Sequence, residues 1–458
     1  MTAVSFHERY AVTRRNLGFP QAITLIVSYP TAQDLPSAER LADRIQDLQI
    51  HFPLLNAAVQ GPNTQEPYFQ LRDSPTPSSL ILRDVPLVPG AGRAQILQDE
   101  LEHMQNIDTG ILWQVTRYTS ARTSFLALSS DHALLDGRGL FKLLDYLVRD
   151  DISNLLHESV ADVPRLEDTL NVKPDAMLLL GLVYRELFVP KLPSFLQAYL
   201  AAPPSWPTGQ VSIAPNQCPP IYTLLELPLQ TVVGLKAAGR LHQVQTLHPI
   251  LKLSYAVAIW SVVDRPSSMQ LQSPASVRDT KLGHSQCTAC YTASHSVPFQ
   301  PTSGSDFWKE AAAIGAYMSS AIGKRRALQE IGSLSLVPDY TSSADALHPT
   351  GWEKFFSEKM DNKKYSGSLE ISNIGHVDLP TGASDLCWGQ AASPSSTPFG
   401  ISVVGHLGGL RVAGAFRDRS VVDFAAIESV HRVWKRVLDR LVDPVRSDST
   451  LGALVAEE

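Results

Sequence analysis

The sequence predicts an α/β protein made of two subdomains of roughly equal size. The chain has 458 residues, which is longer than one hydrophobic core usually supports. Strand-like and helix-like segments alternate in both halves. Between the halves, residues 202–220 are rich in proline and carry no charge, as is typical of a linker. We therefore predict an N-terminal subdomain over 1–190, a crossover linker over 191–220 and a C-terminal subdomain over 221–458.

Hydrophobic periodicity identifies the main elements. In the first half, two apolar runs predict strands, and two segments with helical spacing predict helices; the strands are 21–29 and 123–130, and the helices are 37–52 and 137–150. In the second half we expect a strand at 221–228, a helix at 229–242, one long helix at 307–330 and a hairpin turning at "LGG" within 399–418. The last helix should bury Ile427, Val430, Trp434, Val437 and Leu441.

Composition and charge argue against several classes of function. The net charge of −6 offers no basic surface for a nucleic acid. Four cysteines are too few for a disulfide framework and fit a reducing compartment, and the N-terminus carries charges where a signal peptide has its apolar core. We therefore expect a cytoplasmic protein that binds no nucleic acid. We also expect it to be a monomer.

The longest apolar stretch, 176–200, is interrupted by charged residues and prolines. It is too short to cross a membrane, so the sequence predicts no integral membrane segment. We expect an amphipathic helix packed on a hydrophobic face, with attachment to a membrane surface as the alternative.

The stretch "SSDHALLDGRGL", residues 129–140, places His132, Asp136 and Gly137 between an expected strand and an expected helix. Loops held by a rigid scaffold are common places for catalytic side chains. An imidazole can take a proton from an alcohol near neutral pH and return it to a leaving group. Gly137 would permit close backbone approach or a positive φ. The alternative is a histidine that only packs in a core turn.

This stretch resembles the His-x-x-x-Asp-Gly signature of the chloramphenicol-acetyltransferase-like superfamily, which includes BAHD acyltransferases, fungal alcohol O-acetyltransferases and the condensation domains of peptide synthetases. Further segments are similar to that family, and together they span most of the chain: "RIQDLQIHFPLLNAAV", "ASVRDT", "LEISNIG" and "DLCWG". The resemblance implies two subdomains, each with mixed sheets flanked by helices, and an active-site tunnel between them.

The chain also departs from that family in two places. Asp131 stands where condensation domains usually carry a first histidine. "DLCWG" retains only Asp385, Trp388 and Gly389 of the plant BAHD motif. The fungal alcohol acetyltransferases are therefore the most similar branch.

The resemblance assigns roles to individual residues. It implies that His132 is the general base and that Asp136 pairs with Arg278 to hold the loop. The developing oxyanion and the pantetheine arm would meet donors among Ser372, Asn373, Trp388 and Thr397, with Ser372 and Asn373 preferred. For the coenzyme A phosphates we expect Lys324, Arg325 and Arg326, or else the basic segment 361–367. Either basic segment is alternatively a solvated face.

A second constellation, His284, Cys287, Cys290 and His295, resembles a zinc site. It lacks a second ligand pair at the usual spacing, so we predict no metal there. Motifs of lipases, P-loop enzymes, zincins and Rossmann oxidoreductases are missing from the sequence.

The resemblance thus implies an acyl-CoA-dependent O-acyltransferase. Its co-substrate would be acetyl-CoA, its acceptor a hydroxyl of a small, largely apolar metabolite of terpenoid or polyketide type, and no cofactor would be permanently bound. The alternative is a protein of the same fold that cyclises, isomerises or only binds a metabolite.

Overall fold

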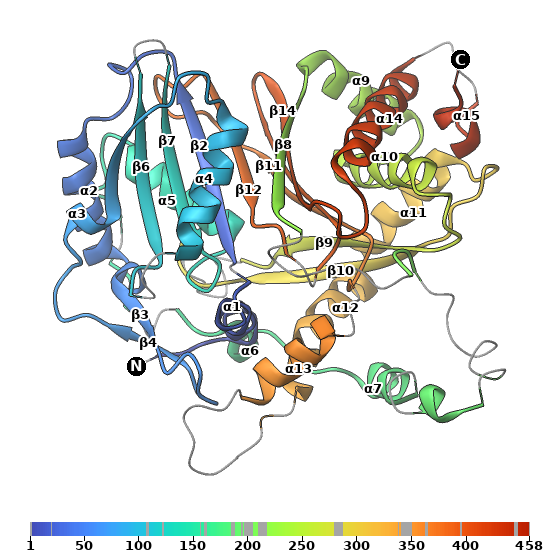
Figure 1. Cartoon of the computed structure of the whole chain (residues 1–458), viewed down its shortest axis with the longest axis horizontal. Coiled ribbons are helices and arrows are strands. Elements are labelled where there is room, and N and C mark those ends of the chain that lie inside the picture. The colour runs from blue at the N-terminus through green and yellow to red at the C-terminus, as the bar shows by residue number, and fades with distance from the viewer. Residues whose placement is uncertain are drawn as a thin grey trace.

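The computed structural model contains two lobes, each built around its own β-sheet (Figure 1). It describes residues 2–19, 21–106, 110–120, 123–155, 157–159, 163–184, 188–193, 196, 205–208, 218–278, 287–337, 339, 350–361, 365–393, 396–443 and 448–457. The α/β class and the two-lobed organisation predicted from the sequence are confirmed. Much of the predicted linker, 191–220, lies outside the described residues.

The N-terminal lobe holds a five-stranded sheet in the order β12-β2-β7-β6-β5. These strands are Asp385–Gln390, Ala22–Tyr29, Ser124–Asp131, Trp113–Thr119 and Leu82–Pro86. Alternation along β2 sends its side chains to opposite faces. Ile23, Leu25 and Val27 share a core with α2 (Ala38–His51) and α5 (Gly137–Val148). Ile26 packs on the other face with α4 (Arg93–Asn106).

The C-terminal lobe holds a six-stranded sheet in the order β10-β9-β11-β13-β14-β8. The strands are Thr292–Phe299, Met269–Ser276, Leu369–His376, Phe399–His406, Gly409–Arg417 and Pro220–Leu227. Helices on this lobe are α9 (Leu229–Leu241), α10 (Leu247–Val262), α11 (Phe307–Ser319), α14 (Phe424–Val442) and α15 (Leu451–Val455). The predicted hairpin is β13–β14, and the five apolar residues predicted on the last helix are all buried.

The remaining elements connect or flank the two lobes. A small sheet, β1-β4-β3, pairs Thr2–Ala3, Tyr68–Leu71 and Ala57–Gln60. The short helices are α1 (Phe6–Asn16), η1 (Pro53–Asn56), α3 (Ser78–Ile81), α6 (Leu166–Thr169), α7 (Ala176–Val183), η4 (Val189–Lys191), α12 (Ala321–Gly332), η6 (Ser333–Leu336) and α13 (Gly351–Asp361). Figure 1 shows α1 below the two sheets, where they approach each other.

One strand joins the lobes. β12 belongs to the predicted C-terminal segment, 221–458, but it pairs antiparallel with β2 at the edge of the N-terminal sheet. The two halves of the sequence are therefore interleaved in space rather than separated at the linker.

The single helix predicted over 307–330 is wrong, because the chain breaks between α11 and α12 at Ser320. Ser320 adopts an extended conformation, and its hydroxyl accepts a hydrogen bond from the Gly323 backbone N–H at 3.0 Å. Gly323 is required by the bend, since a Cβ there would lie 2.0 Å from the Tyr317 carbonyl oxygen. A serine that caps a new helix thus outweighs the continuous helical spacing.

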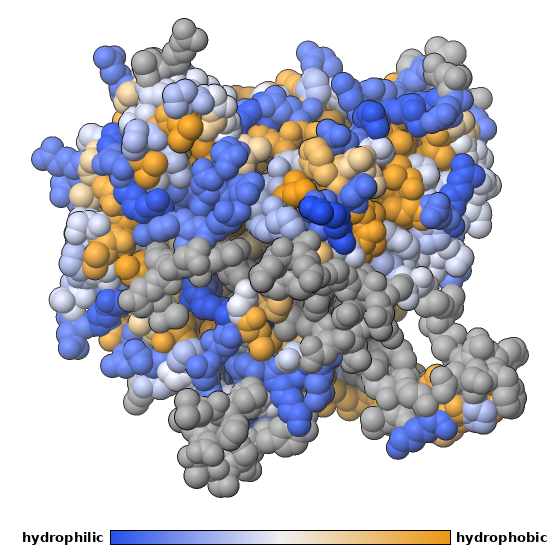
Figure 2. All heavy atoms as spheres, in the orientation of Figure 1, coloured by the Kyte–Doolittle hydropathy of each residue, from blue (hydrophilic) through white to orange (hydrophobic). Residues whose placement is uncertain are grey.

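The expectation of a packed amphipathic helix within 176–200 is also wrong for the described part, α7. Met177 is 74% exposed and Leu180 is 65% exposed, so this helix does not bury an apolar face. Figure 1 shows α7 away from the body of the molecule, and Figure 2 shows apolar surface there. Among the described helices, none is both long and apolar enough to cross a bilayer.

Candidate functional site

His132 lies on the loop that joins β7 to α5, as the sequence predicts. Strand β7 ends at Asp131, and its carboxylate accepts a hydrogen bond from the Ala133 N–H at 2.7 Å while pairing with Arg15 at 2.6 Å. The His132 backbone N–H donates to the Gln21 carbonyl at 2.6 Å. The start of the loop is therefore fixed by hydrogen bonds, which gives His132 a defined position.

Asp136 holds the other end of this loop. It is the N-cap of α5, where its Oδ1 accepts from the Gly139 N–H at 2.8 Å. Both of its oxygens lie 3.1 Å from the Arg278 Nε, and its Oδ2 also accepts from the Tyr291 N–H at 2.9 Å. Burial alone would raise the pKa of Asp136, but Arg278 and these hydrogen bonds hold it below its ordinary value. The carboxylate is thus ionised and fully engaged, so its role is to hold the loop.

Two glycines in the motif let other elements approach the loop. A Cβ at Gly137 would lie 2.8 Å from Ile374 and 3.3 Å from Trp388. Its φ is not positive, so side-chain packing is the reason for this glycine. A Cβ at Gly139, which the sequence analysis did not select, would lie 2.1 Å from the Cys287 carbonyl oxygen. Gly139 therefore lets the segment before β10 lie against the start of α5.

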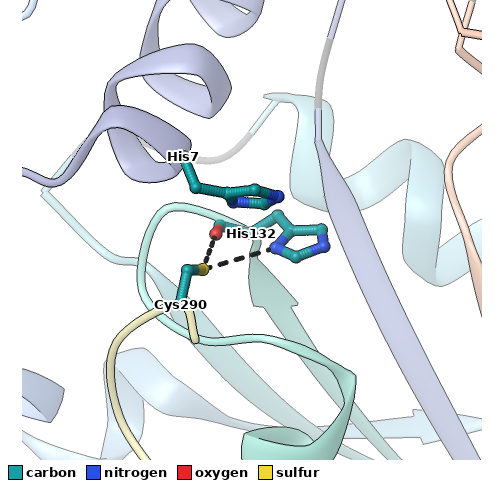
Figure 3. Close-up of side chains that lie close together, drawn as sticks. All are labelled: His7, His132 and Cys290. Carbon is teal, nitrogen blue, oxygen red and sulfur yellow. Dashed lines mark hydrogen bonds between the residues drawn. The ribbon is translucent and has the colours of Figure 1, made fainter. Parts of the chain in front are cut away.

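The ring of His132 is oriented through its Nδ1 atom. The Cys290 thiol donates a hydrogen bond to the backbone carbonyl of His132 at 2.7 Å, and the same sulfur lies 3.5 Å from the ring Nδ1 (Figure 3). Because the thiol proton of Cys290 points to that carbonyl, its sulfur can only accept from Nδ1, so Nδ1 carries the ring proton and Nε2 holds a lone pair. Burial lowers the pKa of His132, although its own carbonyl and Asp136 oppose this. The ring is therefore neutral near pH 7 with Nε2 able to accept a proton.

Helix α1 adds groups to the site that the sequence analysis missed. The ring of His7 lies 5.0 Å from that of His132, centroid to centroid. The helix begins with a capping box in which Ser5 and Glu8 bond each other's backbone N–H, and Glu8 also accepts from the Cys290 N–H at 3.1 Å. The pattern "SFHE" is the Ser-x-x-Glu signal for such a helix start, so the helix was detectable. Its position against His132 was not.

A cavity of about 1510 Å³ lies between the lobes and contains His132. Residues of both sheets line it, together with His7, Tyr10 and Arg14 from α1. Of the predicted site residues, the structure brings seven besides His132 to this cavity: Asp136, Gly137, Arg326, Ser372, Asn373, Trp388 and Thr397. Arg278 lies behind Asp136 and is not part of the lining.

The four predicted oxyanion donors differ in what their polar atoms already bind. The Trp388 indole N–H donates to the Val403 carbonyl at 3.0 Å, and the Thr397 hydroxyl donates to the Phe399 carbonyl at 2.9 Å. Asn373 uses its Oδ1 to accept from the Gly375 N–H at 2.9 Å. Within the described part of the chain, the Asn373 amide N–H groups and the Ser372 hydroxyl make no hydrogen bond. These two residues therefore retain donors for a ligand.

The segment "DLCWG" forms a seam between the lobes. Asp385 on β12 accepts from His406 Nε2 at 2.8 Å and from Arg411 Nε at 3.0 Å, and it also pairs with Arg93 of α4. A Cβ at Gly389 would lie 2.8 Å from Leu97. Packing at the boundary between the lobes therefore accounts for Asp385 and Gly389 of this motif.

The predicted phosphate-binding residues lie on α12. Arg326 lines the cavity, whereas Lys324 is exposed outside it. Arg325 donates to the carbonyls of Asn171 and Lys173. Residues 362–364 of the alternative segment lie outside the described residues. Arg326 is thus the member of this group placed to meet a ligand in the cavity.

Part of the cavity wall is more polar than a largely apolar acceptor would require. His248, His295 and Glu330 line it, and His248 Nε2 lies 2.8 Å from the Ser273 hydroxyl. Lys252 is fully buried, and its Nζ has no hydrogen-bond partner among the described residues. Burial lowers the pKa of Lys252 to about 7 and raises that of Glu330 to about 7. Nothing in the sequence indicated that these four side chains lie close together, because they come from three separate elements, α10, β10 and α12.

The possible zinc site of His284, Cys287, Cys290 and His295 does not form among the described residues. His284 lies outside them, and neither Cys287 nor His295 belongs to a possible metal-ligating group. Cys290 instead joins His7 and His132, with ligand atoms within 4.8 Å of one another.

No protein-family model matches the sequence, and no curated protein matches it. Solved structures do match over almost the whole chain. The epimerization domain from the third module of tyrocidine synthetase B has a TM-score of 0.63 at 13% identity, covering 99% of this chain and 97% of that chain.

Two condensation domains are also similar. The one from the monacolin K polyketide synthase has a TM-score of 0.64 at 9% identity, covering 96% of each chain. The first condensation domain of the CDA synthetase has a TM-score of 0.59 at 13% identity, covering 100% of this chain and 98% of that chain. The chain therefore has the two-lobed fold of these condensation and epimerization domains.

Proposed function

We propose that this protein transfers an acyl group from a coenzyme A thioester to a hydroxyl group of a small molecule. The observation that carries the proposal is the state of His132. Its Nδ1 faces the Cys290 sulfur at 3.5 Å, and the ring lies in the wall of a cavity between the lobes. Nε2 is therefore the nitrogen with a free lone pair, as a general base requires.

In the proposed reaction, the acceptor oxygen attacks the thioester carbonyl while its proton moves to Nε2 of His132. The C–O bond forms and the carbonyl oxygen becomes an oxyanion. Ser372 and Asn373 would donate hydrogen bonds to it, since their donors are not already used by the backbone. The C–S bond then breaks, and the thiolate takes the proton back from Nε2. Asp136 and Arg278 touch no reacting atom and fix the loop that carries His132.

The residues that line the cavity support the proposed donor and bear on the acceptor. Arg326 lines the cavity, as Arg14 and Arg138 do, and we propose that it meets a phosphate of the co-substrate acetyl-CoA. The acceptor would need polar groups as well as an apolar body, because His248, His295 and Glu330 line the same cavity. This refines the largely apolar acceptor expected from the sequence.

Binding of coenzyme A and acetyl-CoA to the purified protein, measured by calorimetry without an acceptor, is the first test. Micromolar binding of both would support the donor, and screening of alcohols with acetyl-CoA would follow. His132→Ala should abolish turnover while the protein keeps its melting temperature and binds acetyl-CoA. A folded His132→Ala variant that keeps its activity would contradict the proposed mechanism.

A second candidate is isomerisation or cyclisation of a bound metabolite. The observation favouring it is the similarity to an epimerization domain, which shows that the fold is also used for chemistry other than condensation. Absence of binding to coenzyme A and acetyl-CoA would favour this candidate or an acyl donor carried on another protein.

A further inference from the structure

Three potential metal ligands converge beside the cavity from distant parts of the chain. They are His7 on α1, His132 on the loop after β7 and Cys290 just before β10 (Figure 3). One nitrogen or sulfur atom of each lies within 4.8 Å of those of the other two. We propose that this cluster binds a thiophilic divalent cation such as Zn²⁺, and that the bound cation switches off His132 as a base.

The ligand types and one key distance fit zinc. Two imidazoles and a thiolate form a set that Zn²⁺ prefers over oxygen-only sites. Tetrahedral geometry with ordinary Zn–S and Zn–N bonds separates sulfur from nitrogen by roughly 3.6 Å. Cys290 Sγ and His132 Nδ1 are already 3.5 Å apart. The His7 ligand atom lies within 4.8 Å of the other two, so it would approach by at most about 1.4 Å, since two nitrogen ligands are separated by roughly 3.4 Å.

His7 provides an independent observation. Its Nδ1 is buried and has no hydrogen-bond partner among the described residues. A buried polar atom without a partner costs free energy, and a cation would satisfy it. The capping box at Ser5 and the bond from Glu8 to the Cys290 N–H fix α1 against the segment that carries Cys290. The same contacts therefore hold two of the three ligands near each other.

Binding would change the protonation of two ligands. The Cys290 thiol, which donates to the His132 carbonyl at 2.7 Å, would release its proton to solvent and bind as a thiolate. The Nδ1 of His132 would give its lone pair to the cation, so the single proton of the neutral ring would lie on Nε2. Nε2 would then donate instead of accepting, and the ring could no longer remove a proton from the acceptor.

The effect on turnover rests on the proposed function, whereas cation binding does not. The first experiment therefore uses Co²⁺ as a spectroscopic probe of the full-length protein after chelator treatment. We expect one equivalent of Co²⁺ to give the visible bands of tetrahedral cobalt and a thiolate-to-cobalt charge-transfer band, and Zn²⁺ to displace both.

Variants assign the ligands. Cys290→Ser should lose the charge-transfer band, and His7→Gln should weaken Co²⁺ binding by at least about tenfold. Cys287→Ser and His295→Gln are matched controls, because these residues lie near in sequence but outside the cluster, and both should bind as the wild type does. Melting temperatures identify any variant that fails to fold. Tight Co²⁺ binding that survives both Cys290→Ser and His7→Gln would overturn the proposal, as would the absence of binding in the folded wild type.

Where acyl transfer is detected, Zn²⁺ should inhibit the wild type, and His7→Gln should require at least about tenfold more Zn²⁺ for the same fractional loss. Each protein is compared with its own metal-free rate. Equal sensitivity of the two proteins would refute the link to His132. Where no acyl transfer is found but Co²⁺ gives the charge-transfer band, the proposed function fails and the metal site stands.

Discussion

The guanidinium Nε of Arg278 lies 3.1 Å from both carboxylate oxygens of Asp136, although 142 residues separate them in the sequence. The pair is buried, with exposed side-chain fractions of 12% and 3%. Arg278 also donates to the carbonyls of Thr288 and Ala289 at 3.1 and 2.5 Å. The Arg278 side chain thus links the loop after β7, which contains His132, to the segment before β10, which contains Cys290.

Replacing Arg278 by leucine should therefore destabilise the fold strongly. The substitution leaves the Asp136 carboxylate buried without its cation, which typically costs about 3 to 5 kcal/mol. The free energy of unfolding in urea measures this loss. Arg419→Leu is the matched control, because Arg419 is 71% exposed in its pair with Asp418 and should cost no more than about 1 kcal/mol. Equal losses in the two variants would contradict a structural role for the buried pair.

Gly139→Ala should be destabilising although alanine favours helices. The added Cβ would lie 2.1 Å from the Cys287 carbonyl oxygen, and backbone on both sides prevents a cheap adjustment. We expect a loss of roughly 1 to 3 kcal/mol in urea unfolding, within the range seen for overpacked sites. Gly181→Ala in α7, where nothing lies within 4 Å, should be neutral or slightly stabilising. Similar effects at both helical glycines would show that the contact at Gly139 is not restrictive.

Local sequence patterns predicted many of the helices and strands, because the residues whose spacing defines each element are close together in the sequence. The loop holding His132 follows from an apolar strand, an N-capping aspartate and the helical spacing after it. Ser320 and the strand β12 show what such patterns miss. The first is a cap that interrupts a helical period, and the second is a strand whose partner lies in the other half of the chain. Pairing partners depend on tertiary packing, which one sequence does not reveal.

The candidate site likewise contains residues that the sequence could indicate and residues that only the structure reveals. His132 and Asp136 lie in one short motif, so spacing alone was enough to select them. His7 and Cys290 reach His132 from positions 125 and 158 residues away, and no periodicity connects them. The four residues predicted as oxyanion donors all line one cavity. Only the structure shows that Trp388 and Thr397 already use their donors in hydrogen bonds to backbone carbonyls, unlike Ser372 and Asn373.

Asn373→Ala should lower kcat with little effect on stability. Its side-chain N–H groups are the donors that would meet the oxyanion, and removing one such donor typically costs about 10²–10³ in kcat. Thr397→Val is the comparison, because the Thr397 hydroxyl already donates to the Phe399 carbonyl and should contribute little to catalysis. Steady-state kinetics with acetyl-CoA and an accepted alcohol measure both. A larger kcat loss in Thr397→Val than in Asn373→Ala would reverse this assignment.

The pH dependence of kcat/KM should reflect the lowered pKa of His132. Burial lowers this pKa below its ordinary value of 6.5, and the nearby Arg14 acts in the same direction. A general base works only when neutral, so activity should persist below pH 6.5 and fall only as the pH passes the lowered pKa. Arg14→Gln should move this acid limb to higher pH, because it removes a cation that opposes protonation. An acid limb at or above pH 6.5 in the wild type would contradict the assignment.

Glu8 should make the fold less stable as the pH rises. Burial raises the pKa of Glu8 to about 7 from 4.5, although bonds from the Ser5 and Cys290 N–H groups oppose the change. The folded protein therefore holds this proton more tightly than the unfolded chain. The stabilisation is complete below pH 4.5 and is lost as the pH rises through about 7, with an upper limit of about 3 kcal/mol. Glu8→Gln cannot titrate, so its stability relative to the wild type should improve between pH 5 and 8.

The measurement is urea unfolding of both proteins across that range, with Glu428→Gln, an exposed carboxylate on α14, as the control. Other buried groups titrate in the same window, among them Glu330, whose pKa is also raised to about 7 by burial. Only the difference between wild type and variant therefore reports on Glu8. Curves for wild type and Glu8→Gln that stay parallel from pH 5 to 8 would mean that Glu8 is ionised throughout. In that case its bonds to Ser5 and Cys290 outweigh burial, and helix α1 would hold the Cys290 segment equally well at every pH.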